Sequence, residues 1–186
     1  MTDRVTELYS KLENCDICPQ NCHVNRLKGK TGICKQSQAP KISSAFLHHG
    51  EEPPLVGQSG SGTIFFTGCN LKCVYCQNYE ISHLDIGDEI TVSELSNIMI
   101  SLQSRGALNI NLVSPSHQSA AIADALELAK ERGLCIPVVY NCGGYESVET
   151  LRLLEGLIDI YMPDIKYFND DKAWAYSRAK NYSEPV

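Results

Sequence analysis

The 186-residue chain has no run of about 18 apolar residues, so no segment has the composition of a membrane-spanning helix. Its N-terminus, MTDRVTELYSKLENC, lacks the basic-then-apolar pattern of a secretory signal. An excess of one charge is also lacking, because 16 Lys and Arg residues stand against 22 Asp and Glu residues, a net charge of −6. So small an acidic excess gives no general attraction for nucleic acid or anionic lipid. We therefore expect a cytoplasmic protein that does not bind membranes and whose overall charge does not attract nucleic acid.

The composition is otherwise that of one folded soluble domain, with 43% hydrophobic and 20% charged residues. The unusual feature is a total of nine cysteines, an odd number in a chain without an export signal. A reducing compartment disfavours disulfides and favours thiols that bind metals or act in catalysis. The cysteines at 15, 18, 22 and 34 form one group and those at 69, 73 and 76 a second. Two metal sites are therefore predicted, and Cys135 is interpreted as a small core residue.

Residues 1–62 form the first predicted segment. Val5, Leu8 and Leu12 have helical spacing, which predicts a short amphipathic helix within residues 1–14. From Cys15 to about Gly62 the sequence has little periodicity and many Gly, Pro and Ser residues, as expected of a loop held by ligands rather than by a core. The basic residues of this stretch, including Arg26, are interpreted as a solvated face. We expect a Cys-rich metal-binding extension.

Residues 63–186 alternate short apolar runs with amphipathic helical patterns. Strands are predicted at 63–68, 108–113, 134–140 and 157–166, and helices at 91–106, 122–133, 146–155 and after 169. Thr91 and Glu94 have the spacing of a capping box. This alternation predicts an α/β fold with a parallel sheet and right-handed crossovers. Four such units do not close a barrel, so we expect a truncated chain; the alternative is a small open sheet complete at Val186.

The loop after the first predicted strand reads GCNLKCVYCQN and contains Cys69, Cys73 and Cys76. In parallel βα folds, the active site lies outside the C-terminal ends of the strands. Three thiolates leave one iron of a four-iron cluster without a protein ligand. An open coordination position distinguishes a catalytic metal site from a structural one. We therefore predict a catalytic iron–sulfur cluster, the alternative being a zinc ion with His83 or Cys142 as its fourth ligand.

The spacing C-x3-C-x2-C, with an aromatic residue just before the third cysteine, resembles the signature of the radical S-adenosylmethionine (SAM) enzymes. The string from EEPPLVGQSGSGTIFFTGCNLKCVYCQNYEIS through NINLVSPSH and YNCGGYE to DIYMPDIKY resembles a subgroup of iron–sulfur proteins similar to pyruvate formate-lyase activating enzyme. The resemblance covers essentially the whole chain. It implies a partial (β/α)6 barrel of the TIM-like radical SAM type, of which about four units are present.

By this resemblance, the three cysteines of the loop hold a [4Fe-4S] cluster, and the amino and carboxylate groups of SAM chelate its fourth iron. One electron passed to the sulfonium breaks a C–S bond and yields the 5′-deoxyadenosyl radical, which abstracts a hydrogen atom. Tyr75 borders the adenine, and Gln77 and Asn78 are further cofactor-binding candidates just beyond the cluster. The protein supplies positioning and excludes water, because the chemistry belongs to the cofactor.

Two further loops carry candidates that the resemblance places near SAM. The loop SPSH, where many family members have a Gly-Gly-Glu motif that binds the SAM amino group, offers Ser114 for cofactor binding. His117 is a catalytic candidate in the same loop, or a hydrogen-bond partner at a helix start. The turn NCGG offers Asn141 and Gly143 near the ribose or carboxylate of SAM, although the activases have an Asp where this chain has Tyr140.

The loop MPDIK follows the last predicted strand and resembles the Asp-x-Lys sequence of the activases. It offers Met162 for cofactor binding and Asp164 and Lys166 for catalysis. Side chains two residues apart on a strand face the same side, so both charged groups are expected to point into the barrel. The alternative is an internal salt bridge at the barrel mouth.

Cys15, Cys18, Cys22 and Cys34 have the spacing C-x2-C-x3-C followed by a fourth cysteine twelve residues on. Four thiolates suit zinc in a tetrahedron, and they equally suit a second [4Fe-4S] cluster. The spacing does not decide which of the two metals is bound. The group could relay electrons, shape the substrate entrance or tie down a segment that lacks a core.

The resemblance implies an oxidoreductase of the glycyl-radical-enzyme activase type, which abstracts hydrogen from a backbone position of a protein substrate. Its implied partner is a low-potential electron donor such as flavodoxin or ferredoxin. Alternatives with the same chemistry use a small molecule or RNA as the hydrogen donor, and the basic residues of the extension keep RNA open. The alternative from another class is a noncatalytic zinc or iron–sulfur binding module.

Overall fold

The computed structural model describes residues 2–184 and contains a six-stranded mixed sheet in the order β3-β1-β2-β4-β5-β6. The strands are β1 (Lys41–His48), β2 (Ser61–Phe66), β3 (Asp88–Glu89), β4 (Ile110–Val113), β5 (Val138–Cys142) and β6 (Ile160–Pro163). The helices are α1 (Asp3–Ser10), α2 (Pro53–Val56), α3 (Tyr79–His83), α4 (Val92–Ser104), α5 (Ser119–Glu131), α6 (Val148–Leu153) and α7 (Asp170–Ser177), with the short 3-10 helices η1 (Arg26–Lys28) and η2 (Ser116–Gln118). The α/β class predicted from the sequence is confirmed.

Strands β2, β4, β5 and β6 run parallel, as the alternation of strands and helices predicts. Gly62, Ile110 and Val138 lie side by side in the first three of these strands. Their connections pass through helices because parallel neighbours need a long crossover. The edges of the sheet are β3 and β6. Closure into a partial barrel and truncation of the chain both stay predictions.

Strand β1 is the main departure from the sequence prediction, which expected an irregular segment through about residue 62. It pairs antiparallel with β2 and, at the sheet edge, with β3. Ala45 and Leu47 pack on the core, and the ring of Phe46 stacks on Phe65 with centroids 5.6 Å apart. The register of β1 shifts near its start, which masks the period of two in KISSAFLH. The sheet therefore crosses the boundary predicted at residue 62.

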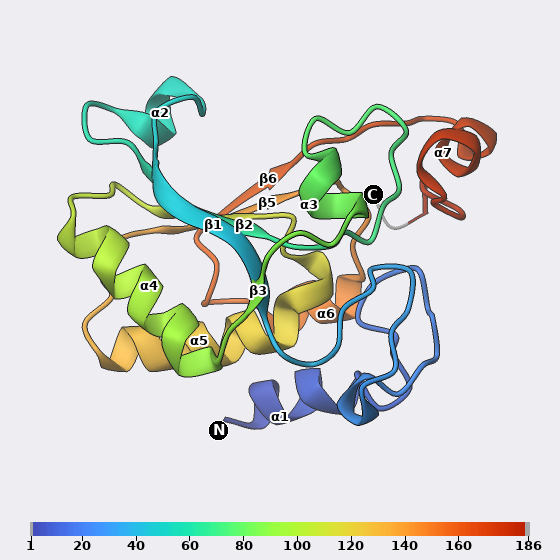
Figure 1. Cartoon of the computed structure of the whole chain (residues 1–186), viewed down its shortest axis with the longest axis horizontal. Coiled ribbons are helices and arrows are strands. Elements are labelled where there is room, and N and C mark those ends of the chain that lie inside the picture. The colour runs from blue at the N-terminus through green and yellow to red at the C-terminus, as the bar shows by residue number, and fades with distance from the viewer. Residues whose placement is uncertain (1, 185–186) are drawn as a thin grey trace.

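Helices α1, α4, α5 and α6 cover one face of the sheet (Figure 1), and the main core lies between them and the strands. Val5, Leu8 and Leu12 enter this core and are almost fully buried, as their spacing predicts. A helix as short as α1 is marginal alone, so its packing on α5 and α6 stabilises it. Cys135 is exposed, contrary to the core prediction, because β5 begins only at Val138.

Capping residues set the starts of three helices. The Glu94 N–H donates to Thr91 Oγ1 (3.1 Å) and the Thr91 N–H donates to the Glu94 carboxylate (2.7 Å), which confirms the predicted capping box on α4. Ser147 caps α6 and Asn169 caps α7 through their side-chain oxygens. Helix α5 starts before the predicted residue because η2 leads directly into it.

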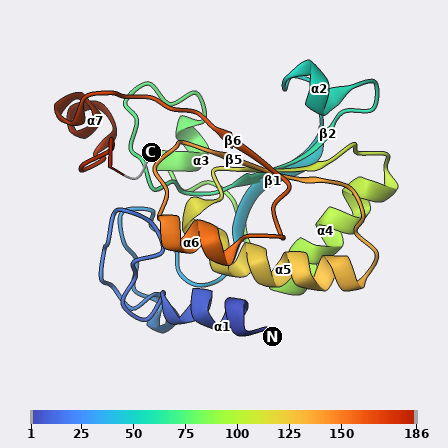
Figure 2. The same ribbon diagram turned by 180° about the vertical axis from the view of Figure 1, so that it is seen from behind.

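The parallel strands all end on the same side of the molecule. The loops that follow β2, β4, β5 and β6 therefore meet there, beside α3 and α7 (Figure 2). The N-terminal segment, blue in both ribbon views, curls next to the same end. Within residues 2–184, no helix combines the length and apolar character needed to cross a bilayer.

Candidate functional site

The three cysteines of the loop after β2 each have a hydrogen-bonding neighbour at sulfur. The Leu71 N–H donates to Cys69 Sγ (3.4 Å), the Ser177 hydroxyl donates to Cys73 Sγ (3.0 Å), and Cys76 Sγ lies 3.2 Å from Ser82 Oγ. No cysteine within the described residues forms a disulfide. Hydrogen bonds to sulfur help set the properties of iron–sulfur clusters, so these donors suit thiolate ligands.

The loop that contains Cys69, Cys73 and Cys76, the thiol loop, has a donor set that fits an iron–sulfur cluster. Burial raises the pKa of Cys69 to about 11, and the neighbouring thiols of Cys73 and Cys76 add to the rise. A bound metal would replace the proton, because thiols bind metals as thiolates. Among residues 2–184, no three cysteine, histidine or acidic side chains already converge as the ligands of one ion. The fit thus rests on three soft donors in one short loop, each with a neighbour at sulfur.

His83 and Cys142, the two candidates for a fourth zinc ligand, each have other contacts in the structure. His83 Nδ1 lies 2.8 Å from Ser82 Oγ, and its ring stacks on Tyr79 with centroids 4.5 Å apart. Cys142 is buried in the main core and hydrogen-bonds with Glu146. Zinc with one of these two side chains as its fourth ligand stays the alternative prediction.

A chain of hydroxyl groups connects Tyr75 to the thiol loop. The Tyr75 hydroxyl lies 2.5 Å from that of Tyr167, which lies 2.7 Å from Ser177 Oγ, the donor to Cys73. Gln77 and Asn78 follow directly after the third cysteine and are exposed. Sequence reasoning missed Ser177 and Tyr167, because α7 is brought to the loop only by the fold. Contact of Tyr75 with adenine stays a prediction.

The loop after β4 places Ser114 near the strand ends and His117 in the interior. Ser114 has a positive φ of 56°, and its N–H donates to the Asn141 carbonyl (2.9 Å). His117 is buried, and its Nε2–H donates to the Thr67 carbonyl (2.7 Å), since a carbonyl can only accept. Burial lowers the pKa of His117 to about 3, helped by the charge of Arg26. A neutral His117 therefore lies behind the thiol loop.

The turn NCGG contacts the thiol loop directly. Asn141 is half-buried at the end of β5. A Cβ on Gly143 would lie 2.6 Å from Leu71 Cδ1, so only glycine allows this approach without a shift of the leucine. The Tyr182 hydroxyl donates to the Gly143 carbonyl (2.6 Å) and holds the turn in place. The two loops that the resemblance assigns to cofactor binding are thereby brought together.

The loop after β6 contains an ion pair between Lys166 and Asp164. The Lys166 side chain is mostly covered, whereas the Asp164 side chain is exposed. Burial opposes the charge of Lys166, but the hydrogen bond and charge of Asp164 raise its pKa overall. Met162 is half-buried in β6 itself, beside Asn141 of β5. The structure thus shows an ion pair, but its exposed carboxylate differs from the internal salt bridge of the alternative interpretation, and the catalytic roles of both residues stay predictions.

A buried carboxylate, missed by the sequence reasoning, ties the loops after β4 and β5 together. Glu146 accepts hydrogen bonds from Ser116 Oγ (2.5 Å) and from the Tyr140 hydroxyl (3.1 Å). Burial raises the pKa of Glu146 to about 7, against the lowering effect of these donors and of Cys142. A cavity of about 220 Å³ adjoins it, lined in part by Tyr161. The string YNCGGYE contains this residue but gives no local signal of its burial.

The N-terminal cysteines lie in a compact turn structure. Cys15, Cys18 and Cys34 are buried and Cys22 is half-buried. Burial raises the pKa of Cys18 and of Cys34, and the nearby thiols of the group add to both rises. Thiols that influence one another in this way suit a shared metal by donor type, although they do not converge as ligands in the described residues.

This N-terminal group packs directly against the thiol loop. A Cβ on Gly68 would lie 2.5 Å from the Cys34 carbonyl oxygen, so the two backbones touch at this point. The Gln20 side-chain amide donates to the Asn70 carbonyl (2.8 Å). Asn70 in turn donates to the Tyr145 carbonyl (2.6 Å). The contacts lie on both sides of Cys69, which spacing in the sequence could not show.

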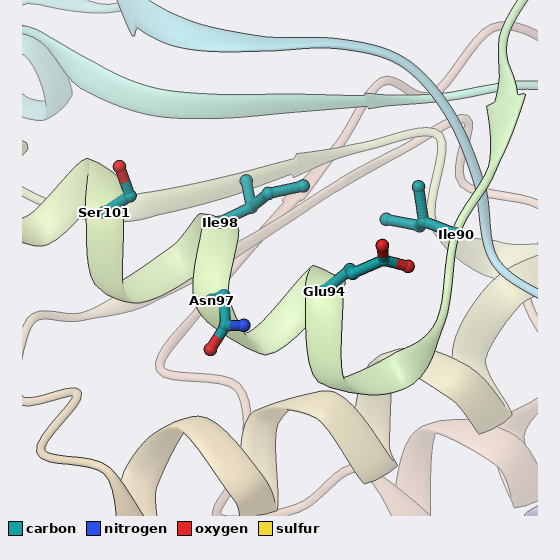
Figure 3. Close-up of a pocket in the computed structure, with 5 residues that line it drawn as sticks. All are labelled: Ile90, Glu94, Asn97, Ile98 and Ser101. Carbon is teal, nitrogen blue, oxygen red and sulfur yellow. The ribbon is translucent and has the colours of Figure 1, made fainter.

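Another hollow, of about 430 Å³, lies beside α4 (Figure 3). It is lined by Ile90, Glu94, Asn97, Ile98 and Ser101. The Glu94 carboxylate serves the capping box of the helix. No thiol lines this hollow, and we assign no chemistry to it.

Comparison with known proteins identifies the family of the chain. The sequence profile of the Radical SAM superfamily matches residues 63–186, the part of the chain with the thiol loop and the four parallel strands. The chain belongs to the Radical SAM superfamily. This membership implies a [4Fe-4S] cluster and SAM as cofactors.

Three curated proteins are similar to the chain. An uncharacterized protein of Methanocaldococcus jannaschii is 36% identical over 183 residues, which cover 94% of this chain and 52% of that protein. The pyruvate formate-lyase-activating enzyme of Clostridium pasteurianum is 31% identical over 134 residues, covering 67% and 54%. A provisionally named glycyl-radical enzyme activating enzyme of M. jannaschii is 32% identical over 109 residues, covering 59% and 44%. The chain spans about half the length of the curated relatives it matches.

Proposed function

We propose that this chain binds a [4Fe-4S] cluster through Cys69, Cys73 and Cys76 and cleaves SAM reductively. The observation that carries the proposal is the position of the three thiols, which follow β2 at the end of the sheet where the parallel strands finish. When bound, the cluster supplies the electron that breaks the C–S bond of SAM and gives the 5′-deoxyadenosyl radical, which abstracts hydrogen.

The chain's own residues provide a cradle around this position. Ser114 follows β4, whereas Asn141 and Met162 lie near the ends of β5 and β6. All three are half-buried, so they remain available to a ligand. Tyr75 is held by Tyr167 at the outer side of the loop. We assign to these groups the binding and orientation of SAM, and to the surrounding loops the exclusion of water.

We further propose that the hydrogen donor is a backbone position of a protein, as in a glycyl-radical-enzyme activase. The support is the likeness to one relative named as a pyruvate formate-lyase-activating enzyme and to another named, provisionally, as a glycyl-radical enzyme activating enzyme. A flavodoxin or ferredoxin would then supply the electron. A cytoplasmic location stays a prediction from the sequence.

A second metal, zinc or a second [4Fe-4S] cluster, is proposed for Cys15, Cys18, Cys22 and Cys34. Its support is the burial of three of these thiols and the contact of the Cys34 backbone with Gly68 at the start of the thiol loop. Metal analysis after anaerobic reconstitution separates the two choices, because a second cluster brings about four more iron atoms per chain, whereas zinc brings none.

The Cys73→Ala variant tests the cluster assignment. We expect it to lose production of 5′-deoxyadenosine from SAM under dithionite, measured by liquid chromatography, because one of three cluster ligands is removed. Cys135→Ala is the matched control, since this thiol is exposed and outside both groups. Cleavage at the wild-type rate by Cys73→Ala would refute the assignment.

The substrate class needs its own test. Anaerobic incubation of the reconstituted chain, SAM and a reductant with candidate glycyl radical enzymes should give a glycyl radical signal by electron paramagnetic resonance. Cleavage of SAM without any such signal, together with hydrogen transfer from a small molecule or RNA, would replace the protein substrate by one of these donors.

A further inference from the structure

Arg26 is a buried charge that has no carboxylate partner among residues 2–184. Its side chain is 1% exposed. Its guanidinium instead donates to two backbone carbonyls, from Nε and Nη2 to Ser37 (3.1 and 2.6 Å) and from Nη1 to His117 (2.7 Å). The solvated face expected for Arg26 is therefore wrong, because these carbonyls hold the side chain inside. Burying a charged group costs free energy unless hydrogen bonds such as these compensate for the lost water.

The two carbonyls belong to different parts of the molecule. Ser37 follows the last cysteine of the N-terminal group, whereas His117 is in η2, on the loop after β4. Arg26 itself lies in sequence between Cys22 and Cys34. Its planar group can reach both carbonyls at once, which a single ammonium does less well. One side chain thus fastens the N-terminal segment to the parallel part of the sheet.

The connection continues from His117 to the thiol loop. The Nε2–H of His117 donates to the Thr67 carbonyl, two residues before Cys69. Its Nδ1 is buried and has no hydrogen-bond partner among the described residues, so the ring makes this one polar contact. Thr67 is further fixed by its N–H to the Lys41 carbonyl (2.9 Å). The start of the thiol loop is therefore anchored through a histidine that Arg26 holds.

We propose that Arg26 is a positioning residue, which, through His117 and Thr67, makes the geometry of the thiol loop depend on the N-terminal cysteine segment. The inference rests on the proposed function, because the thiol loop is taken as the cluster site. By this inference, the thiol loop adopts its cluster-binding conformation only when the N-terminal segment, with a metal bound by its four cysteines, is in place. Four thiolates around a metal are also anionic and would offset the buried charge of Arg26.

The first test measures amide hydrogen exchange in the anaerobically reconstituted full chain. The amides of Thr67, Gly68 and Lys72 donate to backbone carbonyls and report on the loop. In Arg26→Gln, exchange over residues 66–72 should become about ten- to a hundred-fold faster, because hydrogen bonds from a charged donor are lost. Exchange in α4 should not change.

Arg4→Gln is the matched control, since Arg4 also donates to a backbone carbonyl, that of Glu155 (2.7 Å), but on the exposed side of α1. It should leave exchange over residues 66–72 at the wild-type rate. Arg26→Lys keeps the charge without the fork and should give an intermediate rate. It also keeps the test open if Arg26→Gln fails to fold.

The second test reads the cluster itself. In His117→Leu, which removes only the step from η2 to Thr67, the change that SAM causes in the electron paramagnetic resonance signal should weaken as in Arg26→Gln. The double variant should show no further loss, because both residues act in one connection. Additive losses would overturn the inference.

The outcomes separate this inference from the proposed function. A wild-type chain with no SAM-sensitive signal contradicts the proposed function. A wild-type chain with such a signal, together with Arg26→Gln that folds, exchanges over residues 66–72 at the wild-type rate and keeps the full response to SAM, overturns only the positioning of the loop by Arg26.

Discussion

The contact between Gly68 and the N-terminal cysteine segment predicts a measurable cost for adding one methyl group. Gly68 immediately precedes Cys69 and has a φ of +82°, a backbone conformation that residues other than glycine rarely adopt. In Gly68→Ala, the new Cβ would lie 2.5 Å from the Cys34 carbonyl oxygen and 2.9 Å from the Gln36 side chain. The substitution therefore adds both backbone strain and overlap with another segment.

The two costs can be separated by a control glycine. A left-handed conformation costs about 1–2 kcal/mol for an L-residue, and overlap in a packed site costs about 1–3 kcal/mol more. Gly106 has a φ of +92°, and a Cβ added there would meet no atom within 4 Å, so Gly106→Ala should show the first cost alone. We expect Gly68→Ala to lower the unfolding free energy by about 1–3 kcal/mol more than Gly106→Ala does.

Urea unfolding followed by circular dichroism measures this difference, and iron content after reconstitution measures its consequence. Iron at the thiol loop should fall in Gly68→Ala and stay unchanged in Gly106→Ala, because only the first variant pushes Cys34 away from the loop. Equal destabilisation of the two variants, with equal iron content, would refute the close packing of the two cysteine groups.

Two further predictions concern Glu146 and the α4 cap. Burial raises the pKa of Glu146 from 4.5 to about 7, so its contribution to stability is present below about pH 4.5 and is lost as pH rises through 7, by up to about 3 kcal/mol. Urea unfolding at about pH 5 and pH 8 should show this fall in the wild type but not in Glu146→Gln, and identical falls would contradict the burial of this carboxyl. Thr91→Ala should lower the unfolding free energy by about 1 kcal/mol through loss of the capping box, while Ser101→Ala, on the exposed side of the same helix, should change it little; equal effects would argue against the cap.

The parallel part of the fold could be predicted because its signals are local. The strands β2 and β4 come from short, continuous apolar runs, and the start of α4 is specified by two residues, Thr91 and Glu94. Strand β1 has no such local signal, since its register shifts and its stability comes from pairing with β2 and β3. Strand identity of this kind is decided by the neighbours, not by the segment itself.

The candidate site also has a part that local sequence predicts and a part that only the fold brings together. The three cysteines of the thiol loop lie within eight residues, so their spacing alone predicted a shared metal. The hydroxyl that donates to Cys73 Sγ belongs to Ser177, 104 residues away in the sequence. The burial of Arg26 likewise depends on backbone carbonyls that only the fold brings close to it. A basic residue in a loop without apolar periodicity gives no sign of such burial, and a single Glu after a glycine pair gives no sign of the buried cluster around Glu146.

The most direct test of the cluster assignment is electron paramagnetic resonance of the anaerobically reconstituted, reduced chain with and without SAM. We predict the signal of a reduced [4Fe-4S] cluster whose shape changes on addition of SAM, because Cys69, Cys73 and Cys76 leave one iron open to it. The same spectrum with and without SAM, or a preparation that holds zinc and gives no cluster signal, would contradict the account.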